Sequence, residues 1–251
     1  MNNKRIREIE EELKSTDERT LLYDKYAQDS RIGVQRLIEK YRTLDEKLLR
    51  ERLRIKQMLS YEHEYASYGM ICGVDEAGRG PLAGPVVAGA VILPPEPMIL
   101  YLNDSKQLSP AKREVLYDEI LQKAVAVGVG MAEPKRIDEI NILQATYEAM
   151  RQAVERLHPA PDVLLNDAVT IPGLSIKQVP IIKGDAKSLS IAAASVIAKV
   201  TRDRLMEDYE KEFPGYGFAS HKGYGSQKHI EALKKLGPCP IHRRSFIGNF
   251  I

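Results

Sequence analysis

The sequence has little cysteine, no proline in its first 80 residues and no long apolar run. Its two cysteines, Cys72 and Cys239, lie far apart and form no CxxC pair, so we expect free thiols in a reducing compartment. The apolar run at residues 86–93 is only eight residues long, too short to span a membrane. The first twenty residues are charged throughout and do not resemble a signal peptide. These absences predict a cytoplasmic protein that does not enter a membrane.

The distribution of proline and glycine divides the chain. All 14 prolines lie at or beyond Pro81, and the first 70 residues contain only two glycines, Gly33 and Gly69. This shift predicts a helical N-terminal extension, residues 1–69, and a main domain, residues 70–251, that ends in a small helical region. Residues 71–180 carry 10 basic and 14 acidic side chains, and residues 181–251 carry 12 and 7. An acidic centre beside a basic rim fits these counts, and so does ordinary variation of surface charge.

The extension has the pattern of amphipathic helices. Apolar residues recur between Val34 and Leu59 close to one helical face. Ser15 with Glu18 three residues later suggests a capping box that starts a new helix. We interpret the extension as a helical hairpin packed on the main domain; the alternative is an arm for nucleic acid or a partner.

The main domain alternates strands and helices. We expect strands at residues 70–75, 86–93, 125–132, 161–167 and 175–182, and helices at 109–124, 137–157, 188–213 and 226–236. Pro180 makes the fifth strand an edge strand or an interrupted one. The alanine- and serine-rich start of the helix at 188–213 predicts close backbone packing in the core. The order predicts an α/β layered fold with a mixed sheet.

Four acidic residues lie where strands are expected to end: Asp75, Glu76, Asp167 and Asp185. Adjacent side chains on a strand point to opposite faces, so Asp75 and Glu76 can converge only where the strand ends and turns. Converging carboxylates repel each other unless a cation neutralises them, and hard divalent cations prefer oxygen ligands. Such a cluster suits two Mg²⁺ or Mn²⁺ ions roughly 3.5–4 Å apart, which activate water and stabilise the leaving oxygen in phosphodiester cleavage.

Each acid also has a simpler interpretation. An isolated Asp-Glu pair is usually a solvated turn. Asp167 could cap the turn that follows it, and Asp185 could pair with Lys183 or Lys187. The position of all four after apolar runs favours the metal site without excluding these alternatives.

Six motifs in order resemble bacterial ribonuclease HII. They are GVDEAGRGPLAGPVVAGAVIL, NDSKQLS, RIDEINILQATYEAM, KGDAKSLSIAAASVIAKVTRDRLM, FPGYGFASHKGYGS and HRRSF, spread over residues 70 to 247. The resemblance implies a ribonuclease-H-like fold, with residues 70–251 as its catalytic domain. It also implies a metal-dependent endoribonuclease that cleaves the RNA of RNA–DNA hybrids, and single ribonucleotides in duplex DNA. Cleavage would fall on the 5′ side of the ribonucleotide and leave 3′-hydroxyl and 5′-phosphate ends.

The resemblance also implies residue roles. Asp75, Glu76, Asp167 and Asp185 match the four catalytic, metal-binding acids of that family. Gly78, Arg79 and Gly80 match the loop that senses the 2′-hydroxyl, the group that distinguishes RNA from DNA. Tyr224 matches the tyrosine that stacks on the neighbouring deoxyribose; taken alone it would be a turn aromatic between two glycines.

Basic residues near these motifs are candidate phosphate contacts, which fix register rather than sequence. Arg79 and Lys106 lie beside motif loops; the further candidates are Lys183, Lys187, Lys222, Lys228, Arg243 and Arg244. We interpret His221, His229 and His242 as surface or phosphate-neighbouring residues, because they lack metal-ligand spacing. Ser188 and Ser190 would cap the helix at 188–213, or bind a phosphate there.

Two features depart from the family pattern. The residue before the third acid is usually apolar, but here it is Asn166, which should point away from Asp167. Many members also lack a segment like residues 1–69. The competing hypotheses are a ribonuclease HIII-like enzyme that needs runs of ribonucleotides and a non-catalytic hybrid-binding protein. We expect a monomer.

Overall fold

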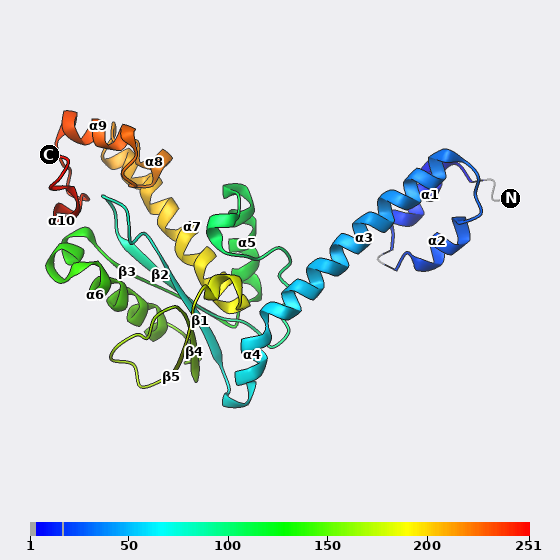
Figure 1. Ribbon diagram of the computed structural model, residues 1–251, viewed down its shortest axis with the longest axis horizontal. Coiled ribbons are helices and arrows are strands. Elements are labelled where there is room, and N and C mark those ends of the chain that lie inside the picture. Colours follow the sequence, from blue (N-terminus) through cyan, green and yellow to red (C-terminus); the bar gives the residue numbers. More distant parts are fainter. Residues whose placement is uncertain (1–3, 17) are drawn as a thin grey trace. The chain divides into compact units, whose positions relative to one another are not determined.

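The computed structural model describes residues 4–16 and 18–251, and they form two compact units divided between Arg54 and Ile55 (Figure 1). The first unit contains α1 (Ile6–Lys14), α2 (Thr20–Tyr26) and most of α3 (Ile32–Met58). Its core joins side chains from all three helices: Ile9, Leu13, Tyr23, Tyr26, Val34, Leu37, Ile38 and Tyr41. The apolar face predicted for α3 is interrupted, because Leu44 and Leu49 are exposed.

The capping box predicted at Ser15 and Glu18 is wrong. Ser15 ends α1, where its amide donates to the carbonyl of Glu11. The next helix begins only at Thr20, and the amide of Glu18 donates to the hydroxyl of Thr16 instead.

The second unit is built on a mixed sheet of five strands in the order β3-β2-β1-β4-β5. The strands are β1 (Ile71–Ala77), β2 (Val86–Ile92), β3 (Ala126–Ala132), β4 (Val163–Asp167) and β5 (Lys177–Ile181). β1, β4 and β5 run parallel, whereas β2 is antiparallel to both β1 and β3. All five predicted strands are present, and β5 lies at the edge as Pro180 predicts, because proline has no amide hydrogen for a second neighbour.

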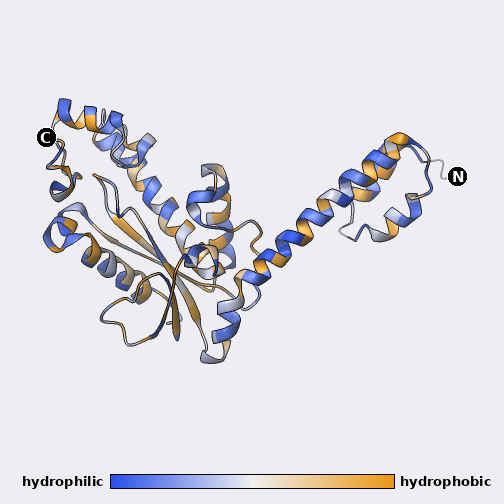
Figure 2. Cartoon of the chain, viewed as in Figure 1, coloured by the Kyte–Doolittle hydropathy of each residue, from blue (hydrophilic) through white to orange (hydrophobic). Residues whose placement is uncertain are grey.

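Helices cover both faces of this sheet (Figure 1). The strands are more apolar than the helices that cover them (Figure 2). Cys72, Val74, Ala88 and Ala90 pack with α6 (Pro134–Glu155). The alternate strand positions meet α7 (Leu189–Glu212), as strand geometry requires.

α7 approaches the sheet closely. A Cβ atom on Gly73 would lie 2.0 Å from the carbonyl carbon of Ser190, and one on Gly89 would lie 2.5 Å from the carbonyl oxygen of Ala194. The small side chains at the start of α7 leave room for this contact, so the predicted close packing is confirmed.

The helices α5 and α6 also begin close to their predicted positions. α5 (Pro110–Lys123) begins after Ser109, whose hydroxyl accepts a hydrogen bond from the amide of Lys112. α6 begins three residues earlier than predicted and has a break at Asn141, with φ of 66°. The side chain of Asn141 accepts from the amides of Leu143 and Gln144 and so restarts the helix.

A buried carboxylate joins α4 (Ser60–Tyr65) to the start of α7. Oε1 of Glu62 accepts hydrogen bonds from the Ser188 hydroxyl at 2.6 Å, the Ser190 amide at 2.9 Å and the Ser190 hydroxyl at 2.7 Å. Ser188 is also the N-cap of α7, because its hydroxyl accepts from the amide of Ile191. The capping role predicted for Ser188 is therefore confirmed.

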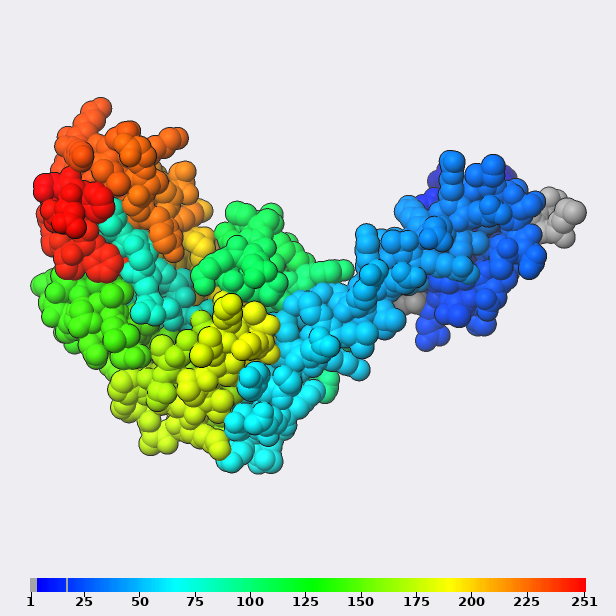
Figure 3. All heavy atoms as spheres, in the orientation of Figure 1, coloured from blue at the N-terminus to red at the C-terminus, as the bar shows by residue number. Residues whose placement is uncertain are grey.

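Three helices follow α7: α8 (Phe218–His221), α9 (Gln227–Leu236) and α10 (Arg244–Ile247). α9 matches its prediction, whereas the four-residue helices α8 and α10 were not predicted. The carboxylate of Asp138 accepts from the amides of Arg244 and Ser245. The last residues, red in Figure 3, accordingly lie against the green part of the chain that contains α6.

Candidate active site

Three of the predicted acids meet at one edge of the sheet. In the parallel pairing of β1 and β4, Val74 lies opposite Asn166, so the next residues, Asp75 and Asp167, leave that pairing side by side. Asp167 lies opposite Ile181 of β5, after which the chain turns into a 3₁₀ helix, Gly184–Ala186, that contains Asp185. Carboxylate oxygens of Asp75, Asp167 and Asp185 lie within 4.8 Å of one another.

Glu76 lies outside this group of three. β1 continues to Ala77, with Glu76 paired to Ala88 of β2, so the strand does not end between the two acids. Strand alternation separates the two adjacent side chains, but Glu76 still borders the group, because its charge raises the pKa of Asp75 and the charge of Asp167 raises its own. Its Oε1 lies 3.5 Å from Nη1 of Arg79. The role of Glu76 as a metal ligand stays a prediction.

The acidic edge is electrostatically strained in the way that a cation would relieve. Burial, followed by the charges of Glu76 and Asp167, raises the pKa of Asp75 well above its ordinary value. Burial also raises the pKa of Glu76, although Arg79 opposes this. For Asp185, burial and then the charges of Asp104 and Asp167 raise the pKa, and Lys106 opposes them. Converging oxygen donors with raised pKa values fit a hard divalent cation.

Sequence reasoning missed three residues beside these acids. Asp104 lies close enough to Asp185 to raise the pKa of that carboxyl, and its Oδ1 lies 4.0 Å from Nζ of Lys106. The hydroxyl of Ser195 lies 2.8 Å from the hydroxyl of Ser105, and Ser195 is close enough to Asp75 to lower the pKa of that carboxyl. Asp104 and Ser105 precede Lys106 in the motif NDSKQLS, and that position is the signal that could have found them. Ser195 lies in the alanine-rich part of α7, where the sequence predicts only close packing.

Lys106, which was predicted to contact phosphate, lies beside the acidic cluster. Its Nζ lies 3.9 Å from Oδ2 of Asp185, and its side chain is 76% exposed. Oδ1 of Asp167, on the other side of the cluster, accepts a 2.7 Å hydrogen bond from the amide of Gly184. The exposed ammonium can reach an anion beside the three carboxylates.

The loop Gly78–Gly80 follows β1 directly and lies next to Tyr224. Gly78 has φ of 93°, a conformation that favours glycine, and a Cβ atom there would lie 2.0 Å from Nε of Arg202. A Cβ atom on Gly80 would lie 3.9 Å from Cε1 of Tyr224. The side chain of Tyr224 is 46% exposed. A flat, accessible ring therefore lies beside the loop at the end of the strand that carries Asp75.

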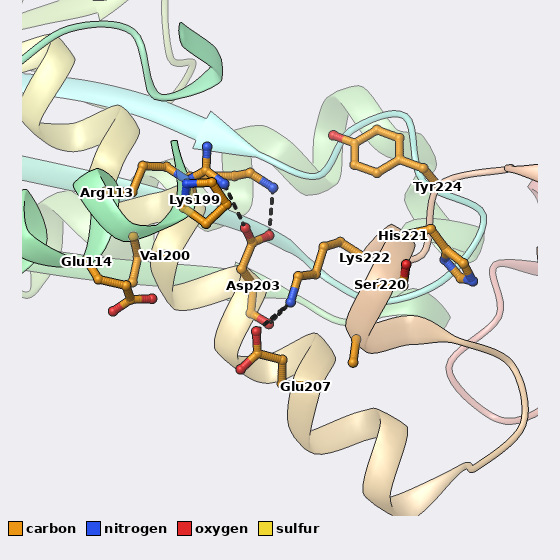
Figure 4. Close-up of a pocket in the computed structure, with 12 residues that line it drawn as sticks. Arg113, Glu114, Lys199, Val200, Asp203, Glu207, Ser220, His221, Lys222 and Tyr224 are labelled. Atoms are coloured by element: carbon orange, nitrogen blue, oxygen red, sulfur yellow. Dashed lines mark hydrogen bonds and ion pairs between the residues drawn. The ribbon is translucent and has the colours of Figure 1, made fainter. Parts of the chain in front are cut away.

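Tyr224 also borders a polar pocket of about 480 Å³ (Figure 4). Its charges are largely paired: Lys199 with Asp203 at 2.6 Å, Arg113 with Asp203 at 3.7 Å and Lys222 with Glu207 at 2.6 Å. Lys222, predicted as a phosphate contact, is thus engaged with an acid.

Arg243 was predicted to contact phosphate and is placed differently. Its side chain is fully buried, and its guanidinium donates to the carbonyls of Gly78, Arg79 and Gly84. It is therefore inaccessible to a phosphate at the surface. The residues predicted with it that are exposed are Lys183, Lys187, Lys228 and Arg244.

Two of the three histidines, His229 and His242, are not the surface residues that we predicted, whereas His221 is only half-buried. His229 and His242 are buried, and the ring of His221 stacks on that of His229 with centroids 4.4 Å apart. The missed signal was their neighbourhood in sequence, since aromatic and glycine residues surround His221 and His229.

Asn166 points away from Asp167, as expected. It is fully buried, and its amide donates to Oε1 of Gln178 at 2.8 Å, while Gln178 also bonds both backbone groups of Ile171. The amide nitrogen of Asn166 is therefore satisfied on the opposite face, whereas its buried Oδ1 has no hydrogen-bond partner among the described residues.

The mixed five-stranded sheet with helices on both faces and the acidic cluster beside β1 and β4 match the ribonuclease-H-like fold of similar solved structures. A family model described as "Ribonuclease HII" matches residues 72–249, and one described as "Ribonuclease HII N-terminal domain" matches residues 5–66. The chain belongs to the ribonuclease HII family. It is thus an endonuclease that hydrolyses phosphodiester bonds, and it acts on RNA–DNA hybrids.

Individual relatives agree with this. The chain is 62% identical over 249 residues to a ribonuclease HII of Lachnoclostridium phytofermentans, covering 98% of each chain. It is 51% identical over 255 residues to one of Acetivibrio thermocellus, covering 100% of both. Among solved structures it resembles ribonuclease H2 of Pyrococcus horikoshii, with a TM-score of 0.59, 32% identity and coverage of 70% of this chain and 93% of that one.

A second solved structure is the PCNA:RNase HII complex of Archaeoglobus fulgidus, with a TM-score of 0.62, 27% identity and coverage of 72% of this chain and 96% of the other. In the described residues, no helix is long and apolar enough to cross a membrane.

Proposed function

We propose that this enzyme is a metal-dependent endoribonuclease that cuts at single ribonucleotides within duplex DNA as well as in hybrids. It would cut on the 5′ side of the ribonucleotide and leave 3′-hydroxyl and 5′-phosphate ends. One observation carries the specificity: the accessible ring of Tyr224 lies beside Gly80, in the loop that follows the strand bearing Asp75. This arrangement supports a site that examines the sugar next to the bond being cut.

Asp75, Asp167 and Asp185, with Glu76 beside them, would hold Mg²⁺ or Mn²⁺. Bound there, divalent cations would lower the pKa of the attacking water and neutralise charge on the leaving oxygen. The amide of Glu76 donates to Oδ1 of Asp75 at 2.7 Å, and Ser195 also lowers the pKa of this carboxyl. Both would favour the ionised form that a metal ligand needs.

The basic side chains around the acidic cluster would position the substrate. Lys106, exposed and 3.9 Å from Asp185, would bind a phosphate oxygen of the cleaved strand. Arg79, with 44% of its side chain exposed, would bind a second phosphate. Lys183 and Lys187 flank Asp185 and are exposed, so they could follow the backbone further.

The loop Gly78–Gly80 would read the 2′-hydroxyl through its backbone, because glycine leaves amide and carbonyl groups unobstructed. Tyr224 would then pack against the next sugar, where a flat ring fits a deoxyribose and excludes an additional hydroxyl. Together they would read the junction between ribose and deoxyribose.

A cleavage assay tests the proposal. A DNA duplex with one ribonucleotide, end-labelled, should be cut once in the presence of Mg²⁺ or Mn²⁺, with the ribonucleotide retained on a 5′-phosphate. Cleavage of only those duplexes that contain several consecutive ribonucleotides would instead support a ribonuclease HIII-like activity.

A further inference from the structure

Two arginines are buried beneath the proposed sugar-reading site. Arg202 is 1% exposed and Arg243 is fully buried. Among residues 4–16 and 18–251, no carboxylate forms an ion pair with either guanidinium. Burial lowers the pKa of Arg202 to about 10 and of Arg243 to about 9. Burying a cation without an anionic partner costs desolvation free energy. The hydrogen bonds that each guanidinium donates must therefore offset this cost.

Arg243 binds the loop itself. Its Nη2 donates to the carbonyl of Gly78 at 2.6 Å, its Nη1 to that of Arg79 at 2.8 Å and its Nε to that of Gly84 at 2.9 Å. The planar guanidinium therefore holds both ends of the segment Gly78–Gly84.

Arg202 joins this segment to the turn that carries Tyr224. Its Nη2 donates to the carbonyl of Ala83 at 3.1 Å and its Nε to that of Pro85 at 2.9 Å. Its Nη1 donates to the carbonyl of Lys222 at 2.9 Å. The guanidinium carbon also lies 5.9 Å from the centroid of the Tyr224 ring.

These bonds determine where the amides of the loop point. In a trans peptide the carbonyl and the following N–H point in opposite directions. Because the carbonyls of Gly78 and Arg79 face Arg243, the amides of Arg79 and Gly80 face away from it. In the described part of the chain, neither amide donates to a protein acceptor.

We propose that Arg243 and Arg202 are positioning residues for sugar recognition: they hold the Arg79 and Gly80 amides and the Tyr224 turn in one fixed arrangement towards the substrate. This inference rests on the proposed function, in which those amides meet the 2′-hydroxyl. The two arginines touch no substrate; they act through the backbone of the loop. A lysine in either place keeps the charge but cannot hold three carbonyls in one plane.

An enzyme-by-substrate cycle tests the proposal. Single-turnover cleavage is measured on two duplexes that differ at one sugar, which carries a 2′-hydroxyl or a 2′-fluoro group. Fluorine cannot donate a hydrogen bond and accepts one poorly. The variants are Arg243→Lys and Arg202→Lys. Arg204→Lys is the matched control, on the same helix but with a partly exposed side chain paired to Glu114. Thermal melting establishes that each variant is folded.

We expect the hydroxyl-to-fluoro rate ratio to fall about tenfold in both variants, the factor for one misdirected hydrogen bond, and to stay unchanged in Arg204→Lys. A ratio within about twofold of the wild type in either folded variant would overturn the proposal. So would loss of folding in both, which would make the arginines general supports of the fold. A wild-type ratio near one would refute the proposed recognition of the 2′-hydroxyl itself.

Discussion

The Nε2 atoms of His229 and His242 lie 3.1 Å apart within a buried chain of hydrogen bonds. The amide of Cys239 donates to Nδ1 of His242 at 3.0 Å, so the proton of that ring is on Nε2. His242 then donates to Nε2 of His229, and Nδ1 of His229 donates to the carbonyl of Tyr224 at 2.9 Å. The direction of every bond requires both rings to be neutral.

This buried hydrogen-bond network predicts that the folded protein loses stability in acid. Burial lowers the pKa of His229, and it lowers that of His242 to about 4. Between about 4 and the unfolded value of about 6.5, the unfolded chain therefore binds more protons than the folded one, and stability falls as the pH falls. Melting curves from pH 7 to 4.5 should show this loss, worth about 2 kcal/mol or more at the lower end.

The variant His242→Asn tests whether this histidine causes the loss of stability in acid. Its amide oxygen can still accept from Cys239, but it does not titrate, so the melting temperature should be lower at pH 7 and depend less on pH. An unchanged pH slope in the variant would mean that other groups cause the acid sensitivity.

Neutralising Asp75 should separate activity from stability. Asp75→Asn removes one charge from a buried group of like charges, so we expect cleavage to fall more than about a hundredfold. The metal-free protein should become more stable at pH 7, since repulsion is relieved. Activity and metal-free melting measure the two effects. Asp208→Asn, on an exposed acid, should change neither. Full activity in Asp75→Asn would show that the site is misassigned.

Gly78→Ala should damage the loop from within. The positive φ of 93° strains alanine, and the added Cβ would lie 2.0 Å from Nε of the buried Arg202. We expect a loss of about 1–3 kcal/mol in the free energy of unfolding, measured by urea denaturation, together with slower cleavage. Gly248→Ala is the control, because among the described residues no atom beyond its chain neighbours lies within 4 Å of its added Cβ. Wild-type stability of Gly78→Ala would mean that the loop relaxes easily.

Tyr224 should contribute through its ring rather than its hydroxyl. Because the side chain is 46% exposed, Tyr224→Ala should melt like the wild type but cleave a single-ribonucleotide duplex about tenfold more slowly. Tyr224→Phe keeps the ring and should cleave at nearly the wild-type rate. Equal rates for the alanine and phenylalanine variants would contradict this role.

The layers of the fold were predictable because local signals agreed with their environment. Ser109-Pro110 starts a helix, Pro180 occupies an edge strand, and alanines meet the sheet. The Ser15 prediction failed because a capping motif has little weight when the helix before it extends to the same residue.

The acidic edge could be predicted, but its surroundings could not. Acids that follow apolar runs are visible in sequence, so Asp75, Asp167 and Asp185 could be grouped, but the continuation of β1 through Glu76 to Ala77 could not be seen. The burial of His242 and Arg243 depends on partners more than 150 positions away, such as Ala83 and Gly84, and no local pattern reports that. Polar residue types alone suggested the surface.

The three hydrogen bonds accepted by Glu62 have a practical consequence for dissecting this enzyme. The two family models change between residues 66 and 72, which invites a cut there. Such a cut would discard Glu62, leaving Ser188 and Ser190 without their acceptor, and would strip Ile55, Met58 and Leu59 from the interior that they share with α7. A fragment that begins at Ile55 retains all four. Interchange of the extension between relatives should therefore be made within α3, so that its last turn and α4 stay with the enzyme body.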